Sequence, residues 1–174
     1  MIEVVLRAVR VDVGSATPLL LLEEVGGSRV LPIFIGAPEA TAIAYALQHI
    51  ETPRPMTHDL LYDVIVALGA RLSAIEIVDL VDNTFYANLR LAVDEGEILV
   101  SARPSDAVAL AIRSRASLYV GDDLMDEEAQ FIEVDEDDED EDAETAGESA
   151  PSEAELLAEL RSFLDQVRPE DFDQ

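Results

Sequence analysis

The chain has 174 residues, 49% of them hydrophobic and 28% charged, so it can bury a hydrophobic core in one domain with an appendage. It contains no cysteine, which excludes disulfides and thiolate metal sites and favours a reducing compartment. We expect no signal peptide, because the amino-terminal residues lack a basic region followed by an apolar run. We expect no transmembrane helix, because the longest apolar runs are too short to span a bilayer. These features predict a cytoplasmic protein without a membrane-bound segment.

The formal net charge of −27 is unevenly distributed. Residues 1–121 hold 15 acidic side chains and 9 arginines, whereas residues 122–174 hold 23 acidic side chains and 2 arginines. All 11 basic residues are arginine, which suits bidentate contacts to phosphate or carboxylate, although codon bias also explains it. Because residues 1–121 are themselves net acidic, bulk contact with nucleic acid is disfavoured and any phosphate binding has to be local.

The amino-terminal part predicts three strands followed by a helix. Residues 2–12, 17–25 and 29–35 are rich in Val, Leu and Ile and are separated by glycine-containing turns. The following residues, 36 to about 49, have apolar side chains at helical spacing. These side chains are Ala40, Ile43, Ala44, Leu47 and Ile50.

Two further helices are predicted. One runs from Thr57 to a C-cap near Gly69, and the other from about Pro104 to Arg113. The first of these is expected to bury one apolar stripe. The stripe consists of Leu61, Val64, Ile65 and Leu68.

The strands expected between and after these helices are separated by turns. Residues 71–81 and 84–93 predict a hairpin with a tight turn at Asp82-Asn83, and the second strand alternates apolar and polar side chains. Residues 97–102 and 117–120 predict two more strands. The mixed, strand-rich order predicts an α+β fold with a mixed, largely antiparallel sheet and about three helices.

The carboxyl-terminal part has a different composition. Residues 131–151 contain the acidic run 135–142, without an apolar side chain, and predict a disordered linker. The run is open to three interpretations: a solvated linker, a nucleic-acid mimic that shields a basic cleft, or a segment that binds a basic partner. Residues 152–174 predict an amphipathic helix and tail, and so short a helix requires a docking partner.

Two Arg-Pro steps each lead into an apolar helical pattern. They are residues 54–61, RPMTHDLL, and residues 103–110, RPSDAVAL. Proline is tolerated in a first helical turn, and we expect the Thr57 and Ser105 hydroxyls to cap the N–H groups that follow. A helix start alone does not require an arginine. Each segment therefore predicts a polar helix mouth with charges of both signs.

Several segments occur in the order known from one protein family. They are 31–36 (LPIFIG), 39–40 (EA), 54–61 (RPMTHDLL), 84–87 (TFYA) and 103–111 (RPSDAVALA). Over about residues 1–130 the chain resembles the bifunctional nuclease domain family of bacteria and plants. The resemblance implies an α+β fold and hydrolysis of phosphodiester bonds in DNA and RNA. The acidic linker departs from the compact domain of that family.

Phosphodiester hydrolysis requires an activated water, stabilised charge on phosphate and a protonated leaving group. Carboxylates that hold Mg²⁺ or Mn²⁺, in some cases with a histidine base, are a common solution, and no organic cofactor is required. The catalytic candidates lie near three helix starts and are Glu39, His58, Asp59 and Asp106. The three carboxylates among them are the candidate metal ligands. Candidates for holding substrate phosphate, aided by helix N-termini, are Arg54, Thr57, Arg103 and Ser105.

Each candidate also has an ordinary structural explanation. Carboxylates in a first helical turn offset the helix dipole, which accounts for Glu39, Asp59 and Asp106. Arginines form ion pairs with such carboxylates, and His58 is equally suited to packing or capping. The spacing matches no established metal motif. Convergence of the three carboxylates in a cleft would favour a metal-dependent nuclease.

We therefore expect a nuclease with nucleic acid as its substrate. The alternative is a non-catalytic oligomeric module that binds an anionic ligand or a protein partner. The dense apolar runs at 19–22 and 30–35 suggest more hydrophobic surface than one small sheet with three helices covers, which predicts a homo-oligomer, most simply a dimer. Tyr45 and Tyr86 are candidates for stacking on bases.

Overall fold

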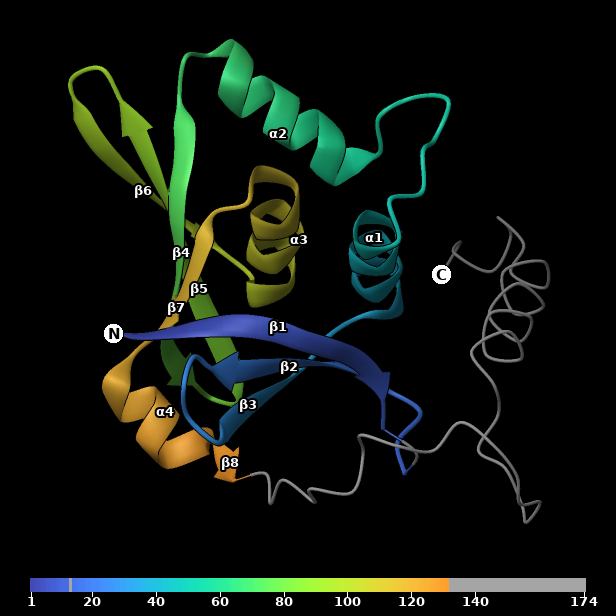
Figure 1. Cartoon of the computed structure of the whole chain (residues 1–174), viewed down its shortest axis with the longest axis vertical. Helices are drawn as coiled ribbons and strands as arrows, with labels where there is room; N and C mark the ends of the chain where they lie inside the picture. The colour runs from blue at the N-terminus through green and yellow to red at the C-terminus, as the bar shows by residue number, and fades with distance from the viewer. Residues whose placement is uncertain (13, 132–174) are drawn as a thin grey trace. The chain divides into compact units, whose positions relative to one another are not determined.

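An eight-stranded sheet is the frame of the domain, with strand order β6-β5-β4-β7-β1-β2-β3-β8 (Figure 1). The computed structural model describes residues 1–12 and 14–131. Among the described strands, β4 and β7 are parallel and the other neighbours are antiparallel. The predicted α+β class with a mixed, largely antiparallel sheet is confirmed.

Most elements lie close to the predicted ranges. The strands are β1 (Ile2–Val11), β2 (Pro18–Glu24), β3 (Arg29–Phe34), β4 (Arg71–Val81), β5 (Thr84–Val93), β6 (Gly96–Ala102), β7 (Ser117–Val120) and β8 (Gln130–Phe131). The helices are α1 (Ala37–Leu47), α2 (Thr57–Ala67), α3 (Pro104–Ser114) and α4 (Asp122–Glu128).

The β4–β5 hairpin has the tight turn that its sequence predicts. Asp82 and Asn83 both adopt positive φ, 49° and 59°, and Val81 pairs with Thr84. Positive φ at both central residues defines a type I′ turn, whose twist matches that of the flanking strands. Asp and Asn tolerate this region better than most residues. The turn therefore follows from local sequence.

Helix α3 is the centre of the core. It contacts α1 on one side and α2 on the other, and it lies against β4, β5 and β7. Seven of its 11 residues are buried, among them Ala107, Ala109 and Ala111. Small side chains at these positions allow neighbouring elements to approach closely. This packing brings the first turns of α1 and α2 toward the first turn of α3.

The sheet is strongly twisted, since β1, β2 and β3 run across the direction of β4 and β5 in Figure 1. Helix α4 packs against β3 and β4, two strands that are not neighbours in the sheet. Leu124 and Met125 of α4 are 7% and 0% exposed. As a result the end of β3 lies near the β4–β5 turn, and both line one groove with the start of α3.

Three predictions about the elements need correction or remain untested. Helix α4 and strand β8 were not predicted, because α4 has seven residues with five acidic side chains and little apolar periodicity. The buried stripe predicted for α2 is confirmed only at Ile65, which is buried together with His58. The other three predicted positions are exposed: Leu61 by 40%, Val64 by 44% and Leu68 by 80%. Helix α2 turns the side that carries His58 toward the core, because His58 has a polar partner there, Asp106. The linker at 131–151 and the helix at 152–174 lie outside the described residues, apart from Phe131.

None of the helices in the described ranges combines the length and apolar character that a membrane span requires.

Candidate active site

The start of α3 carries an arginine held by two carboxylates. Arg103 is the N-cap residue and Pro104 is the first helical residue, where a missing N–H costs nothing. The Arg103 guanidinium donates to both Asp106 oxygens, at 2.7 and 3.0 Å. Its Nη2 also lies 2.8 Å from Glu39 Oε1. The Arg103 side chain is nevertheless 66% exposed, so its outer edge faces solvent.

Glycine at the N-cap of α1 makes room for the second carboxylate. A β-carbon at position 36 would collide with Glu39 Oε2. Because Gly36 has none, the Glu39 carboxylate folds back against its own helix start, where it is 16% exposed, and reaches Arg103. The Gly36-Ala37-Pro38-Glu39 segment thus positions the Glu39 carboxylate next to Arg103.

The start of α2 supplies a buried histidine. His58 Nε2 lies 3.1 Å from Asp106 Oδ1, and the His58 side chain is 11% exposed. Burial of an imidazole without a partner is unfavourable, so the Asp106 contact determines which face of α2 turns inward. We call Glu39, His58, Arg103 and Asp106 the helix-mouth cluster. It joins the first turns of three helices.

Contacts within the helix-mouth cluster shift the pKa values of Asp106 and Arg103. Burial raises the pKa of Asp106, but hydrogen bonds from Arg103 and then His58 outweigh burial and leave that pKa below its ordinary value of 3.8. Hydrogen bonds to Asp106 and Glu39 raise the pKa of Arg103. The carboxylate of Asp106 and the guanidinium of Arg103 are therefore both ionised at neutral pH.

A groove of about 220 Å³ lies beside the helix-mouth cluster. Its walls are the end of β3, the β4–β5 turn and the start of α3, with Arg103 and Ser105 on one side and Asn83 and Thr84 on another. Phe34 also lines it and is 60% exposed. Phe34 lies within the motif at 31–36 but was not predicted as a site residue, because it is the last residue of an apolar strand.

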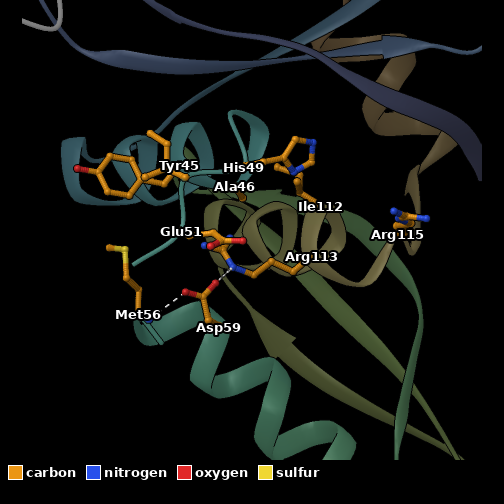
Figure 2. A pocket seen from close by; sticks show the side chains of 10 residues that line it. Tyr45, Ala46, His49, Glu51, Met56, Asp59, Ile112, Arg113 and Arg115 are labelled. Carbon is orange, nitrogen blue, oxygen red and sulfur yellow. Dashed lines mark hydrogen bonds and ion pairs between the residues drawn. The ribbon is translucent and has the colours of Figure 1, made fainter. Parts of the chain in front are cut away.

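A second cavity, of about 350 Å³, lies on the other side of the α2 start (Figure 2). Asp59 and Arg113 face each other there, and the Arg113 side chain is 9% exposed. Arg113 also donates to the carbonyl oxygens of Ala109 at 2.8 Å and Ala42 at 3.2 Å. Asp59 accepts the N–H of Met56 at 2.9 Å, which caps α2. This pair joins three elements of the fold.

The structure thus divides the predicted residues. It brings Glu39, His58, Arg103 and Asp106 together and places Ser105, 6% exposed, in the adjacent groove. Asp59 belongs to the Arg113 pair. Tyr45 lines the second cavity.

Arg54 and Thr57 are exposed, and within the described part of the chain Arg54 forms no ion pair. The predicted hydroxyl caps are wrong. The N-cap residues are Met56 and Arg103, and neither helix has a hydroxyl side chain as its cap. Proline fixes the start of α3, and the Asp59 carboxylate provides the cap of α2 instead.

The arrangement does not fit a preformed metal site. Over residues 1–12 and 14–131, no group of three or more His, Asp or Glu side chains is placed to hold a metal ion. The Arg103 guanidinium lies between Glu39 and Asp106, at the position that a cation bridging them would take. The Asp59 carboxylate forms an ion pair with Arg113.

The partly buried carboxylates of Asp59 and Asp106 predict a loss of stability in acid. Burial raises the pKa of Asp59, but bonds from Arg113 and the Met56 N–H outweigh it, so its pKa is lowered, as is that of Asp106. Such groups add stability above their unfolded pKa of about 3.9, and this stability is lost as the pH falls through their folded pKa. We expect melting curves between pH 6 and 3 to show a smaller acid shift for Asp59→Asn than for wild type. Asp63→Asn, at an exposed carboxylate of α2, should keep the wild-type shift; equal slopes for all three would contradict the prediction.

The site is thus an exposed arginine, held by two carboxylates beside a groove of an α+β domain. The chain belongs to the bifunctional nuclease domain family, whose model matches residues 20–133. This confirms the resemblance noted from its motifs.

Two relatives illustrate the range of similarity. The chain is 44% identical over 170 residues to "Uncharacterized protein Rv1829" of Mycobacterium tuberculosis (strain ATCC 25618 / H37Rv), covering 98% of this chain and 97% of that protein. It is 27% identical over 105 residues to "Bifunctional nuclease 1" of Oryza sativa subsp. indica, covering 59% of this chain and 32% of the rice protein. The similarity to the rice protein therefore concerns the domain alone.

Proposed function

We propose that the protein is a nuclease that hydrolyses phosphodiester bonds in DNA and RNA, with the reacting phosphate bound by Arg103. The observation that carries the proposal is the hydrogen bonding of the Arg103 guanidinium, which leaves one of its nitrogens without a partner among the described residues. Its Nε and Nη2 bind Asp106 and Glu39, whereas its Nη1 makes no hydrogen bond to any described residue. A guanidinium has five N–H donors in a fixed fork, so Nη1 is oriented and available for a phosphate oxygen.

The groove beside Arg103 favours a single-stranded substrate. Phe34 is exposed within reach of the same groove, and a base freed from its complement can stack on an aromatic ring. A duplex keeps its bases inside and presents only phosphates. Because residues 1–121 are net acidic, a long duplex contact would be repelled, whereas one phosphate and one stacked base require only a local site.

The helix-mouth cluster contains side chains of the kinds that can carry protons during hydrolysis, which supports the proposal. A water oxygen bonds to phosphorus while the bond from phosphorus to the leaving oxygen breaks, so the water loses one proton and the leaving oxygen gains one. Imidazole and carboxylate groups most often carry such protons, and His58, Asp106 and Glu39 adjoin Arg103. Arg103 stabilises the charge that develops on the phosphate. Asp59 acts through the position of α2 rather than on substrate.

Dependence on Mg²⁺ or Mn²⁺, with Glu39, Asp59 and Asp106 as ligands, remains a prediction from sequence. For a cation to bridge Glu39 and Asp106, Arg103 would have to leave its present place. Cleavage of labelled single-stranded DNA and RNA, measured with Mg²⁺, with Mn²⁺ and with chelator, decides the metal requirement. Binding without cleavage under all three conditions would favour the alternative, a non-catalytic module for anionic ligands.

Replacing Arg103 with alanine tests the phosphate contact. We expect Arg103→Ala to weaken binding of a labelled single strand about tenfold, the order expected for a charge-assisted bond. The slope of log K against log salt should fall by about 0.7, since one fewer counterion is released.

Arg10→Ala is the matched control, because Arg10 is an exposed arginine of β1 and its loss changes the net charge equally. Equal effects of the two substitutions on affinity and salt slope would show that only overall charge matters, and would overturn the assignment of Arg103.

A further inference from the structure

Strand β6 forms one edge of the described sheet, where its neighbour is β5 (Figure 1). Its central side chains are large, apolar and exposed: Ile98 by 49%, Leu99 by 57% and Val100 by 40%. An edge strand presents unpaired N–H and C=O groups, and proteins commonly protect it with lysine, proline or a very short strand. β6 has seven residues and neither of these protecting residues. It therefore has the features of a strand that pairs with a partner.

Helix α2 leaves an apolar stripe uncovered. Leu61 is 40% exposed and Val64 is 44% exposed, and the stripe continues to Leu68 at the helix end. Residues three and four apart share one side of a helix, so Leu60, 56% exposed, joins the same stripe. The sequence predicts Leu61, Val64 and Leu68 to be part of the core, yet the described residues do not cover them.

The α2 stripe and β6 border the same face of the sheet. Leu72, Leu91 and Ile98 lie opposite one another on β4, β5 and β6, and directly opposed residues share a face. Leu72 is 3% exposed, whereas Ile98 is 49% exposed. The elements that pack on this face of the sheet therefore bury β4 but leave β6 uncovered. Helix α2 ends just before β4 begins. We call the uncovered apolar residues of this face the β6–α2 surface: Leu60, Leu61, Val64, Leu68, Ile98 and Val100. Leu99, between the last two on the edge strand, points to the opposite face of the sheet.

We propose that the β6–α2 surface binds a second copy of this chain, by antiparallel pairing of the two β6 strands about a two-fold axis at Leu99. Pairing along the whole strand places Ile98 opposite the partner's Val100 and Leu99 opposite the partner's Leu99. The charged residue of the strand, Glu97, then faces the partner's Ser101 and meets no like charge. The apolar face continues across the junction, and the two α2 stripes extend it.

The strand lengths favour a closed dimer over a growing sheet. The opposite edge, β8, has two described residues, against seven in β6. Head-to-tail growth would pair edges of unequal length, whereas a two-fold contact joins identical ones and closes. The proposal rests on these edges alone and is independent of nuclease activity.

Charge disfavours the chain's own carboxyl-terminal residues as the occupant. Residues 132–174 contain 18 acidic side chains and 2 arginines. The β6–α2 surface is itself bordered by the exposed carboxylates Asp63, Asp94, Glu95 and Glu97. Like charges on both sides would oppose that contact, whereas pairing about Leu99 keeps the carboxylates apart.

Cysteine substitution tests the axis directly, because the chain has no cysteine of its own. Directly opposed residues of an antiparallel pair have Cα atoms about 4.5–5.5 Å apart, a separation that a disulfide spans. Oxidised full-length Leu99→Cys should therefore run mainly as a covalent dimer on a non-reducing gel. Ser101→Cys, also at an exposed position of the same strand but opposite the partner's Glu97, should remain a single chain. Equal cross-linking of both variants would overturn the proposed register.

Light scattering of the full-length protein at micromolar concentration supplies a second test. Wild type should show twice the chain mass, and Leu99→Lys should show one chain mass, because two ammonium groups would meet at the axis. Val11→Lys changes a side chain of similar exposure, 51%, on β1 and should stay dimeric. A monomeric wild type, or a dimer that persists in a folded Leu99→Lys variant, would overturn the proposal.

Discussion

Asp106→Asn is expected to lower the rate of cleavage at saturating single-stranded substrate at least about 100-fold, the loss typical of an acid–base group. Asp106 is the residue that joins the cluster, since it accepts from both Arg103 and His58. An amide keeps the shape of the carboxylate but has no charge and only one acceptor oxygen. The His58 ring loses the anion that orients it, and the Arg103 guanidinium loses one of its two carboxylate partners.

Binding should change far less than turnover in this variant. Arg103 remains in place through Glu39, so we expect the affinity for substrate to fall only a few-fold. Asp126→Asn is the matched control, because Asp126 pairs with Arg29 at the surface, away from the cluster; its turnover should equal that of wild type. Unchanged turnover in a folded Asp106→Asn variant would remove the helix-mouth cluster from the mechanism.

Local signals predicted most of the fold. Glycine turns, alternation in β5 and the positive-φ pair Asp82-Asn83 each act over a few residues, and the corresponding strands and hairpins were predicted. The orientation of α2 was not, because its inward face is selected by a long-range contact between His58 and Asp106, 48 residues apart. Hydrophobic periodicity is a local property and cannot reveal such a contact. It therefore predicted that the apolar side of α2 faces the core.

The candidate site was predicted in part for the same reason. The Arg103–Asp106 pair lies within one helix turn, so its sequence spacing indicated it. The contact of Arg103 with Glu39 and the pairing of Asp59 with Arg113 join elements far apart in the chain. Sequence spacing therefore suggested Arg54 as the partner of Asp59, whereas the fold supplies an arginine from the last turn of α3.

Two consecutive residues at the start of α2 connect the site to the core. His58 contacts Asp106 in the first turn of α3, and Asp59 contacts Arg113 two turns later. Positions seven residues apart lie on the same face of a helix, so α2 is fixed to α3 at two points. The geometry of the helix-mouth cluster therefore depends on the Asp59–Arg113 pair.

Arg113→Met is accordingly expected to be the most destabilising of the charge substitutions considered, by roughly 2–4 kcal/mol. Methionine retains the apolar stem but leaves the partly buried Asp59 carboxylate without its cation and removes the donors to the Ala42 and Ala109 carbonyl oxygens. For a domain of this size such a loss lowers the melting temperature by about 10 °C. Urea unfolding followed by circular dichroism measures the change.

A double-mutant cycle separates the ion pair from the packing. The Asp59→Asn and Arg113→Met effects should not add, and we expect a coupling of about 1–3 kcal/mol, as for groups in one buried network. Arg7→Met is the matched control, because Arg7 and Glu23 are 3.4 Å apart on the surface, with the Arg7 side chain 43% exposed; such a pair contributes less than about 1 kcal/mol. Equal stabilities of Arg113→Met and Arg7→Met would show that the pair does not fix α2, and turnover should then be unaffected as well.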